Sequence, residues 1–474
     1  MGLDNCSGKQ VLTLRPVSLT TFHREEEMEK QRWGLRKLVL VPCPFQGHIN
    51  PMLQLGNLLH AIGFSITVAH TRFNFPNPDN HPDFTFLPIQ DTLFDRDASS
   101  MDVTDVISCL NISCKAPLKN SLTQIMEREK EDHSHKLPCI IYDGSMYFAE
   151  AVAHELELPS IMLRTTSAAT FLTYYSFPQL LREGYLPLQE AMSLALVPGL
   201  YPLRFKDLPI ANFKNKNLDI LLQQTTRTSD IRSSSAIICN TIDCLEQSSL
   251  ARLQQQCKVP VFPIGPLHTI VPTASSGLLK DDRSCIEWLD KQTHNSVLYV
   301  SLGSIASMNK NELREMAKGL TNSRQPFLWV LRPGSLLPDD FNELIGERGL
   351  IVKWAPQKEV LAHKAIGGFW SHCGWNSTLE SICAGVPMIC QPCFGDQRVN
   401  ARLLTHVWKV GLAMDSSLVS IEIEKAIRRL MLDVEGHELR RKIINLKEKI
   451  ELCTQEGASF YNSLSELRKC ILSC

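Results

Sequence analysis

The sequence predicts an α/β protein with two doubly wound domains, each built on a parallel sheet, that face each other across a cleft. Short apolar runs rich in β-formers alternate with helical patterns, and these runs are continuously apolar, as in parallel sheets buried on both faces. The alternation stops at a Pro/Gly/Ser-rich stretch that begins at Pro260 and then starts again. The chain of 474 residues is long enough for two domains of about 200 residues each.

The first half begins with the apolar run KLVLVPC at Lys37, which leads through PFQGHINP into a helical pattern. We expect Asn50 to cap this helix, Pro51 to take its first position and Gly63 to end it. The strands expected after it are 65–70, 138–143, 160–163 and 236–240, with a helix at about 145–155.

The second half repeats the pattern after the boundary stretch. We expect strands at 296–304, 327–332, 350–354, 367–372 and 387–392, helices at about 311–320 and after Gly374, and a helical tail over 421–472. The predicted divisions are a disordered leader (1–35), an N-terminal domain (36–265), a C-terminal domain (266–450) and a final helix (451–474) that packs back toward the N-terminal domain. Ligands of such sheets bind beyond the carboxyl ends of the strands.

Composition excludes several functions. The net charge is −1, from 49 basic and 50 acidic side chains, which gives no field for nucleic acid. No window reaches the roughly 18 apolar residues needed to span a bilayer. The 16 cysteines are scattered, and Cys390 and Cys393 form a single C-x-x-C without the second pair that a zinc site needs. We therefore expect a cytoplasmic monomer without a metal or a membrane span.

The segment from Trp354 to Gln397 carries the densest set of candidate ligand-binding residues. SHCGWNS reads as a strand end, a glycine turn and a helix N-terminus, where free backbone N–H groups and the helix dipole suit a diphosphate. His372, Asn376 and Ser377 add side-chain donors. Each of these residues taken alone is more often a helix cap or a packing residue, so the argument depends on their occurring together.

Other residues of the segment suit the rest of a nucleotide sugar. Glu380 lies one turn beyond Asn376 on the same helix face, where a carboxylate can accept both hydroxyls of a ribose. Trp354 offers a flat face on which a base can stack. Asp396 and Gln397 follow the strand PMIC, so two polar side chains meet the cleft where sugar hydroxyls would lie.

The whole segment from Trp354 to Gln397 resembles the plant secondary-product glycosyltransferase box. The resemblance extends from about Lys37 to the end of the chain and implies a GT-B fold and a UDP-sugar donor. It implies that the N-terminal domain (36–265) binds the acceptor and that the C-terminal domain (266–450) binds the UDP-sugar. It implies that Trp354 stacks on uracil and that Ala355 contacts the base. The ribose would be bound by Gln357 and Glu380, and the diphosphate by His372, Gly374, Asn376 and Ser377. The sugar would be bound by Trp375, Asp396 and Gln397. In this family a Gln at the last position favours UDP-glucose. VSLGS also matches, with Leu302 where Phe is common, and Ser304 would be a further phosphate contact.

A catalytic pair is expected in the N-terminal half. Transfer to an alcohol needs a base, and histidine suits that role because its pKa lies near neutrality. His48 follows the first strand in the intact motif PFQGH, and the matching histidine is the base in the family. Asp143, at the end of PCIIYD, is the expected partner of its other ring nitrogen, although a helix cap is the alternative interpretation.

These residues predict an inverting transfer of glucose from UDP-glucose to a hydroxyl, nitrogen or carboxyl group of a small lipophilic plant metabolite. The leaving UDP would be stabilised by the helix N-terminus at 374–377, and no divalent metal or other cofactor is expected because no D-x-D motif lies at the cleft. The acceptor loops expected by resemblance are 87–95, 144–147, 194–203 and 394–395, and their apolar character suits a flat aglycone.

Three alternative functions agree less well with the sequence. A sugar-nucleotide-binding protein without transfer activity would be expected to lose His48 or Asp143, and both are present. A dinucleotide-dependent oxidoreductase would need G-x-G-x-x-G after the first strand, where this chain has PFQGHIN. A membrane-bound glucuronosyltransferase would need a C-terminal anchor, and ELRKCILSC is too short and too polar.

Overall fold

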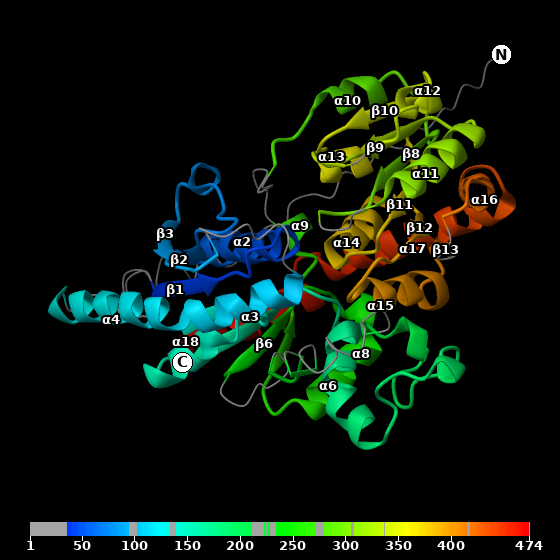
Figure 1. Ribbon diagram of the computed structural model, residues 1–474. Coiled ribbons are helices and arrows are strands. Elements are labelled where there is room, and N and C mark those ends of the chain that lie inside the picture. Colours follow the sequence, from blue (N-terminus) through cyan, green and yellow to red (C-terminus); the bar gives the residue numbers. More distant parts are fainter. Residues whose placement is uncertain are drawn as a thin grey trace, which may run out of the picture.

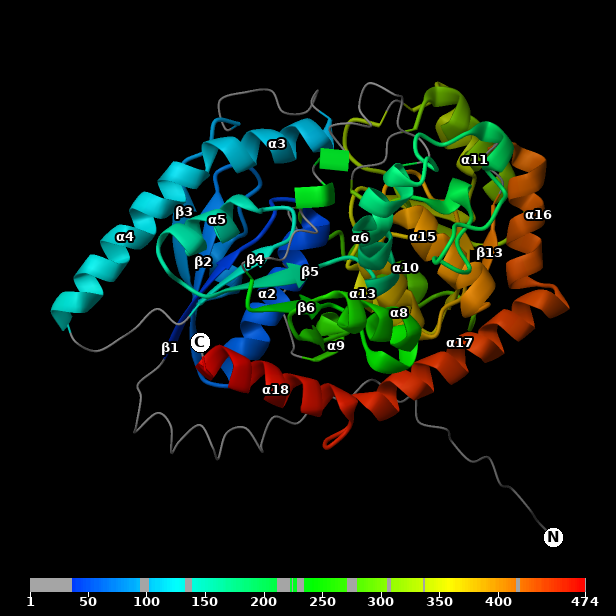
Figure 2. The same ribbon diagram turned by 90° about the horizontal axis from the view of Figure 1, so that it is seen from below.

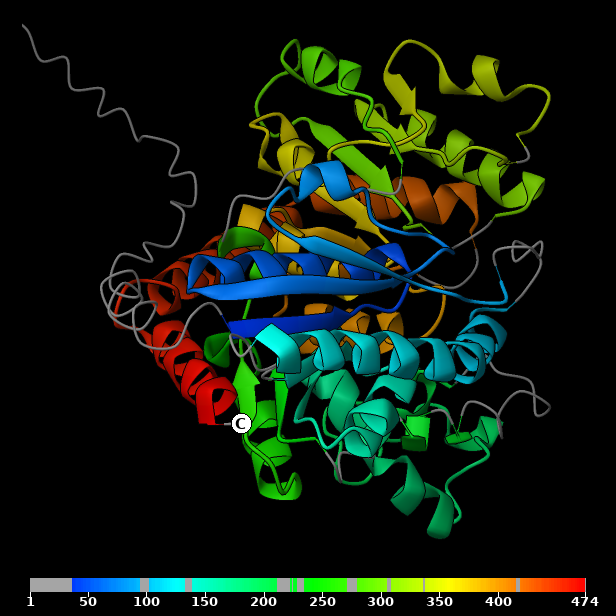
Figure 3. The ribbon, with the colours of Figure 1, turned by 90° about the vertical axis from the view of Figure 1, so that its left-hand side faces the viewer.

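The computed structural model describes residues 36–93, 102–132, 139–210, 222–223, 225–227, 234–270, 279–304, 308–335, 337–414 and 418–473. The leader 1–35, with its predicted disorder, lies outside these residues. Two α/β domains stand side by side, the first coloured blue to green and the second from yellow-green through yellow to orange (Figures 1 and 3).

The first domain contains a seven-stranded, wholly parallel sheet in the order β3-β2-β1-β4-β5-β6-β7. Its strands are β1 (Arg36–Val41), β2 (Phe64–Thr71), β3 (Thr85–Ile89), β4 (Cys139–Asp143), β5 (Ser160–Arg164), β6 (Ala236–Cys239) and β7 (Val261–Pro263). Strands β4 and β5 are buried along their whole length, as continuously apolar runs predict.

Helices cover both faces of this sheet (Figure 3). They are α2 (Gln46–Ala61), α3 (Val103–Ser113), α4 (Lys115–Asp132), α5 (Phe148–Glu155), α6 (Ala168–Arg182), α8 (Asp243–Gln256) and α9 (Leu267–Ile270), with short 3₁₀ turns η1 (Pro78–Asn80), η3 (Glu190–Met192) and η4 (Phe205–Asp207). One core lies between the sheet and α3 to α6, and the other lies between the sheet, α2 and the C-terminal helix.

The second domain contains a six-stranded parallel sheet in the order β10-β9-β8-β11-β12-β13. Its strands are β8 (Val297–Ser301), β9 (Phe327–Val330), β10 (Gly349–Val352), β11 (Ile366–Ser371), β12 (Met388–Cys390) and β13 (Gly411–Ala413). Its helices are α10 (Ser284–Leu289), α11 (Lys310–Asn322), α12 (Phe341–Ile345), α13 (Gln357–Ala362), α14 (Trp375–Ala384), α15 (Gln397–Arg402), the π-turn η5 (Leu403–Val407), α16 (Ser420–Met431) and α17 (Val434–Cys453). The prediction of two parallel-sheet domains is therefore confirmed.

The chain returns to the first domain at its end. Helices α16, α17 and α18 (Ser459–Ser473) run in sequence along one side of the molecule, and α18 lies against the first domain (Figure 2). Phe460, Leu464 and Ile471 of α18 are fully buried in the core beneath the first sheet, and Arg36 Nη1 donates to the carbonyl oxygen of Leu472 at 2.9 Å. No helix in the part of the chain that the structure describes is long and apolar enough to cross a bilayer.

One predicted helix start is wrong. Helix α2 begins at Gln46 with Phe45 as its N-cap, so Pro51 lies inside the helix and Asn50 does not cap it. The Asn50 carboxamide oxygen instead accepts a hydrogen bond from Gln46 Nε2 at 2.9 Å. Pro51 is tolerated because the carbonyl oxygen that its missing N–H would have bonded finds another donor, as described below. His48 therefore lies in the first turn of α2 rather than in a loop.

Three edge strands were not predicted, whereas the glycine at the end of α2 was. Val261–Pro263, inside the predicted boundary stretch, forms the edge strand β7 and pairs with β6. The edge strands β3 and β13 were not predicted, because TFLPI contains a proline and GLA is only three residues long. Gly63 does follow the end of α2, with a φ of 96° that glycine adopts readily.

Candidate active site

A cavity of about 330 Å³ lies between the carboxyl ends of the two sheets. The first domain contributes Phe45, residues of the first half of α2 and the β5–α6 loop, and the second contributes the segments around β8, α13, α14 and α15. The predicted donor-site residues all line this cavity: Ser304, Trp354, Ala355, Gln357, His372, Gly374, Trp375, Asn376, Ser377, Glu380, Asp396 and Gln397. His48 lines it from the opposite domain.

His48 and Asp143 form a hydrogen-bonded pair. The His48 Nδ1 atom lies 2.8 Å from Asp143 Oδ2, and the side chains are 28% and 2% exposed. Asp143 Oδ1 accepts the backbone N–H of Ser145 at 2.8 Å, so the carboxylate is anchored in the turn after β4 and does not cap α5. Because Nδ1 faces a carboxylate, Nε2 is the ring nitrogen left to accept a proton at the cavity.

Thr165 completes this pair and was not predicted. Its hydroxyl lies 3.0 Å from His48 Nδ1 and 3.4 Å from Asp143 Oδ2, and the residue lines the cavity. Thr165 directly follows β5, which is the neighbour of β4 in the sheet. The rule that ligands lie beyond the strand ends could have identified it, since β1, β4 and β5 are adjacent there.

The pair shifts both pKa values. Burial alone lowers the pKa of His48, but the charge and hydrogen bond of Asp143 outweigh it, so the pKa is raised from 6.5. Burial alone raises the pKa of Asp143, but the charge and hydrogen bond of His48 outweigh that effect, so the carboxyl pKa is lowered. Asp143 is therefore charged at neutral pH and stabilises the imidazolium form of His48.

The start of α14 forms a donor-rich turn opposite His48. Cys373 has a φ of 65°, which turns the chain so that α14 begins with Gly374 as its N-cap. His372 packs so closely on this turn that a Cβ at Gly374 or Gly303 would lie 2.5 or 2.6 Å from its Nε2 atom. Burial lowers the pKa of His372 to about 4, so the ring is neutral at pH 7. The turn presents backbone N–H groups to the cavity without a permanent cation.

Pro51 of α2 explains one contact between the domains. A residue other than proline at this position would donate its backbone N–H to the carbonyl oxygen of Gly47, four residues earlier. In this chain the Gly47 oxygen instead accepts a hydrogen bond from Asn376 Nδ2 at 2.9 Å. The proline inside the helix thus frees an acceptor that joins the first turn of α2, which carries His48, to the start of α14.

A second polar cluster lies at the far end of the cavity. Gln357 Nε2 donates to Glu380 Oε2 at 2.7 Å and to Ser377 Oγ at 2.9 Å, and Tyr299 donates to Gln357 Oε1 at 3.3 Å. Burial raises the pKa of Glu380, an effect that the Gln357 hydrogen bond opposes. Trp354 stands beside this cluster, half-buried, and Ala355 is buried. A carboxylate next to an aromatic face suits a nucleoside, with the ribose on Glu380.

The residues predicted to hold the sugar lie near His48 but differ in how their side chains are engaged. The indole of Trp375 is buried and donates its Nε1–H to the carbonyl oxygen of Asn240 at 2.8 Å, so its backbone is the part left for a ligand. Gln397 Oε1 accepts the backbone N–H groups of Cys393 and Phe394 at 2.8 and 3.1 Å. Burial raises the pKa of Asp396, an effect that the hydrogen bond of Asn400 and the charge of His48 oppose.

The predicted acceptor loops lie only partly at this cavity. Phe394 lines it, together with Phe45 and Thr166, which were not predicted. Among the described residues of 87–95, 144–147 and 194–203, none lines it, and residues 94–95 lie outside the described part of the chain. In the third loop Val197, Leu200 and Leu203 are buried in the core of the first domain.

Cys43, His48 and Asp143 form the one group of three potential metal ligands within the described residues, with their ligand atoms within 4.8 Å of one another. The imidazole and the carboxylate already satisfy each other by a hydrogen bond. Burial, followed by the charge of Asp143, raises the pKa of the Cys43 thiol, which opposes the thiolate that a metal would need. The described cysteines are free thiols.

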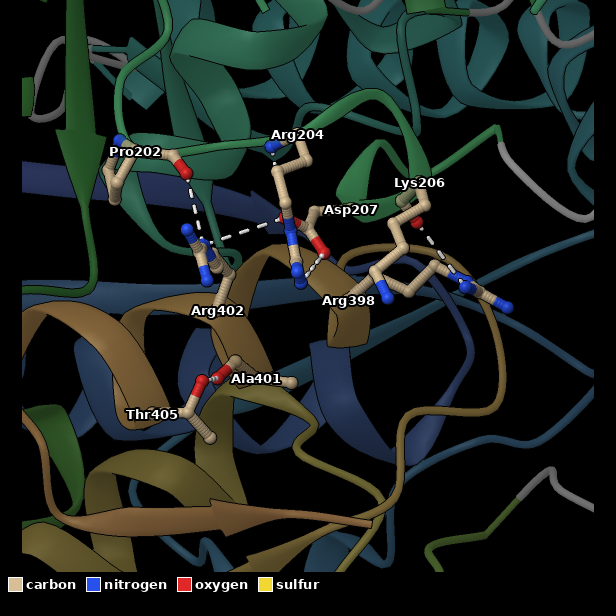
Figure 4. A network of polar contacts seen from close by, with 8 residues as sticks. All are labelled: Pro202, Arg204, Lys206, Asp207, Arg398, Ala401, Arg402 and Thr405. Carbon is tan, nitrogen blue, oxygen red and sulfur yellow. Dashed lines mark hydrogen bonds and ion pairs between the residues drawn. The ribbon is translucent and has the colours of Figure 1, made fainter. Parts of the chain in front are cut away.

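Helix α15 also holds the two domains together through its outer face (Figure 4). Arg402 Nε donates to the carbonyl oxygen of Pro202 at 3.0 Å and lies 3.6 Å from Asp207 Oδ2, which also pairs with Arg204. Arg398 Nη1 donates to the carbonyl oxygen of Lys206 at 3.3 Å. The helix that begins with Gln397 is therefore tied to the loop that follows η3 in the first domain.

Comparison with known proteins gives consistent matches. A family model described as UDP-glucoronosyl and UDP-glucosyl transferase matches residues 89–446. The chain is 48% identical to the flavonol 3-O-glucosyltransferase UGT76E12 of Arabidopsis thaliana, covering 91% of this chain and 96% of that protein. Among solved structures, Os79 from O. sativa in complex with UDP is 27% identical with a TM-score of 0.80, covering 92% of this chain and 100% of that one. UGT2 of Phytolacca americana, complexed with UDP-2fluoro-glucose and pterostilbene, is 29% identical with a TM-score of 0.78, covering 92% and 99%.

Proposed function

Because this chain belongs to the UDP-glycosyltransferase family, with the GT-B architecture of two facing domains, we propose that it transfers glucose from UDP-glucose to a small lipophilic plant metabolite with inversion at the anomeric carbon. The observation that carries the proposal is the placement of the His48–Asp143 pair and the start of α14 on opposite walls of one cavity. A base and an anion-stabilising turn are the two groups that such a displacement needs.

In the proposed reaction His48 Nε2 takes the proton of the acceptor hydroxyl while the oxygen of that hydroxyl attacks the anomeric carbon of glucose. The new carbon–oxygen bond forms as the bond to the diphosphate breaks, and the electron pair leaves with UDP. Asp143 stabilises the imidazolium that forms. Backbone N–H groups at Gly374–Ser377 stabilise the charge on the leaving diphosphate. A single displacement converts the α-linked donor into a β-glucoside.

The assignment of the substrates follows from residues and relatives. Gln397, through the family resemblance, favours glucose as the transferred sugar. UGT76E12 is a flavonol 3-O-glucosyltransferase, and the Phytolacca structure contains pterostilbene, so flat and largely apolar acceptors fit this branch of the family. Phe45 and Phe394 at the cavity suit such an aglycone. We propose that the acceptor atom is a hydroxyl oxygen, with nitrogen or carboxyl acceptors as further possibilities for the same site.

Glucose transfer is tested directly by incubating the protein with UDP-glucose and a panel of flavonols, stilbenes, phenols and terpenoid alcohols. We expect one or more acceptors to gain one hexose by mass spectrometry, and proton NMR of the product to show a β linkage. Since no metal takes part in the proposed step, EDTA should leave the rate unchanged. UDP binding without transfer to any acceptor would favour the alternative, a sugar-nucleotide-binding protein, and an α-linked product would contradict the inverting mechanism.

The pH dependence of transfer should reveal the His48–Asp143 pair. Since the base must be unprotonated and its pKa is raised from 6.5, kcat/KM should increase with pH through a pKa above 6.5. In Asp143→Asn the stabilising charge is lost and burial alone lowers the pKa of His48, so the acid limb should move to lower pH while the rate falls. A pH–rate profile of both proteins measures this. An acid limb that stays in place in Asp143→Asn would contradict the pairing.

A further inference from the structure

We propose that Asn400 is a positioning residue for the transfer, because it holds the carboxylate of Asp396 in place relative to both the diphosphate turn and the N-terminal domain. The inference rests on the proposed function, since it takes Asp396 as a contact of the donor sugar. Asn400 lies in α15 and its side chain is fully buried.

The carboxamide of Asn400 uses its donors and its acceptor on three separate segments. Its Nδ2 donates to Asp396 Oδ2 and to the carbonyl oxygen of Cys373, both at 3.0 Å. Its Oδ1 accepts a hydrogen bond from Ser167 Oγ at 2.9 Å. An amide oriented by three partners on three sides has one favourable position, so it can transmit the placement of each partner to the others.

Two of these partners adjoin the reaction machinery. Cys373 is the residue with a φ of 65° that sets the turn before Gly374, where the diphosphate would bind. Ser167 is the N-cap of α6 and lies two residues after Thr165, whose hydroxyl contacts both His48 and Asp143. Asn400 therefore connects the side of the cavity that carries the base with the side that carries the donor.

Asp396 depends on this contact. It occupies the N-cap position of α15, but its side chain makes no capping hydrogen bond, and the Asn400 amide is the group that holds it. Burial raises the pKa of Asp396, and the Asn400 hydrogen bond opposes this by favouring the charged form. Without that donor, the carboxylate would lose both its orientation and part of the stabilisation of its charge.

Asn400→Leu tests the role because leucine has a similar volume and no polar atoms. We expect kcat/KM for UDP-glucose to fall about 10- to 100-fold, the cost of displacing a substrate-contacting group by around 1 Å. UDP has no glucose for Asp396 to contact, so its Kd should change much less. The ratio of the Kd of UDP-glucose to the Kd of UDP should therefore rise.

Two further variants separate positioning from general stability. Arg402→Gln removes contacts on the outer face of the same helix, so it should lower Tm without changing the ratio of the Kd values. Ser167→Ala removes the bond across the domains, together with the bond by which Ser167 caps α6, and leaves Asp396 held, so it should reduce kcat and Tm with the ratio unchanged. Isothermal titration and steady-state kinetics provide these quantities.

Asn400→Asp gives a readout that a structural role would not move, and it retains the size of the native side chain should the leucine variant not fold. Two carboxyl groups at hydrogen-bond distance share a proton as pH falls, and the protonated Asp at 400 can then donate to Asp396. UDP and His48 also titrate in this range, because UDP ends in a phosphate whose second pKa is about 6 and the charge of His48 acts on Asp396. The ratio of Kd values in Asn400→Asp, divided by the wild-type ratio at the same pH, should therefore return toward one as pH is lowered from 8 to 6.

Equal weakening of UDP and UDP-glucose binding in the Asn400 variants, or a ratio in Asn400→Asp that varies with pH as the wild-type ratio does, would overturn the inference. A wild-type protein that binds UDP-glucose but transfers glucose to no acceptor would instead overturn the proposed function. The two failures are therefore distinguishable.

Discussion

His48→Ala is expected to lower kcat by about 10²- to 10⁴-fold, the usual contribution of a positioned general base, while the Kd of UDP stays close to that of the wild-type protein. The imidazole is bonded to Asp143 and Thr165 on the wall opposite α14, so its removal deletes the proton acceptor without touching the cluster around Glu380. Kinetics with an identified acceptor and titration with UDP measure the two effects separately.

The matched control for this change is His154→Ala, since His154 is exposed on α5 and does not line the cavity. It should retain wild-type kcat and KM. A loss of UDP affinity in His48→Ala as large as its loss of kcat would contradict the role of base and would make His48 a donor-binding residue. Unchanged kcat would assign the proton transfer to another group.

Glu380→Ala should raise both the KM for UDP-glucose and the Kd of UDP by about 10- to 100-fold, since a hydrogen bond to a charged group contributes about 1.5–3 kcal/mol. The expected contact is with ribose hydroxyls, which do not react, so the interaction is equally strong in the ground state and the transition state. Its loss should therefore appear in KM with little change in kcat. The change also leaves Gln357 Nε2 without its shorter bond.

A ligand change isolates this contact. The wild-type protein should bind UDP more tightly than 2′-deoxy-UDP, whereas Glu380→Ala should bind the two with nearly equal affinity. Glu380→Gln keeps one acceptor oxygen and should give intermediate values. If Glu380→Ala discriminates between the two ligands as strongly as the wild-type protein does, another residue binds the ribose. The orientation proposed for the nucleoside in the cavity would then be contradicted.

Most of the fold could be predicted because its signals are local. Strands such as Cys139–Asp143 and Ser160–Arg164 are buried on both faces, and this burial requires continuous apolar runs that are visible in the sequence. The elements that were not predicted include the edge strands β3, β7 and β13, where a few residues carry no periodic pattern, and also the helices α3, α4, α6 and α8 of the first domain. Helix α2 was placed too late because proline usually marks a first turn, and its tolerated position inside the helix depends on a distant donor.

By itself, the sequence determined the two parallel sheets and the residues of the second domain that line the cavity. The turn, the helix start and the polar side chains of 354–397 are contiguous, and their spacing follows from helix and strand geometry. Only the tertiary structure decided which atoms of these residues are already engaged. The bonds of Asn376 to the Gly47 oxygen, of the Trp375 indole to Asn240, of Thr165 to His48 and of Ser167 to Asn400 all join segments far apart in the chain. Such partners depend on how strands pack within a domain and on how the two domains dock, and no local pattern of residues encodes that placement.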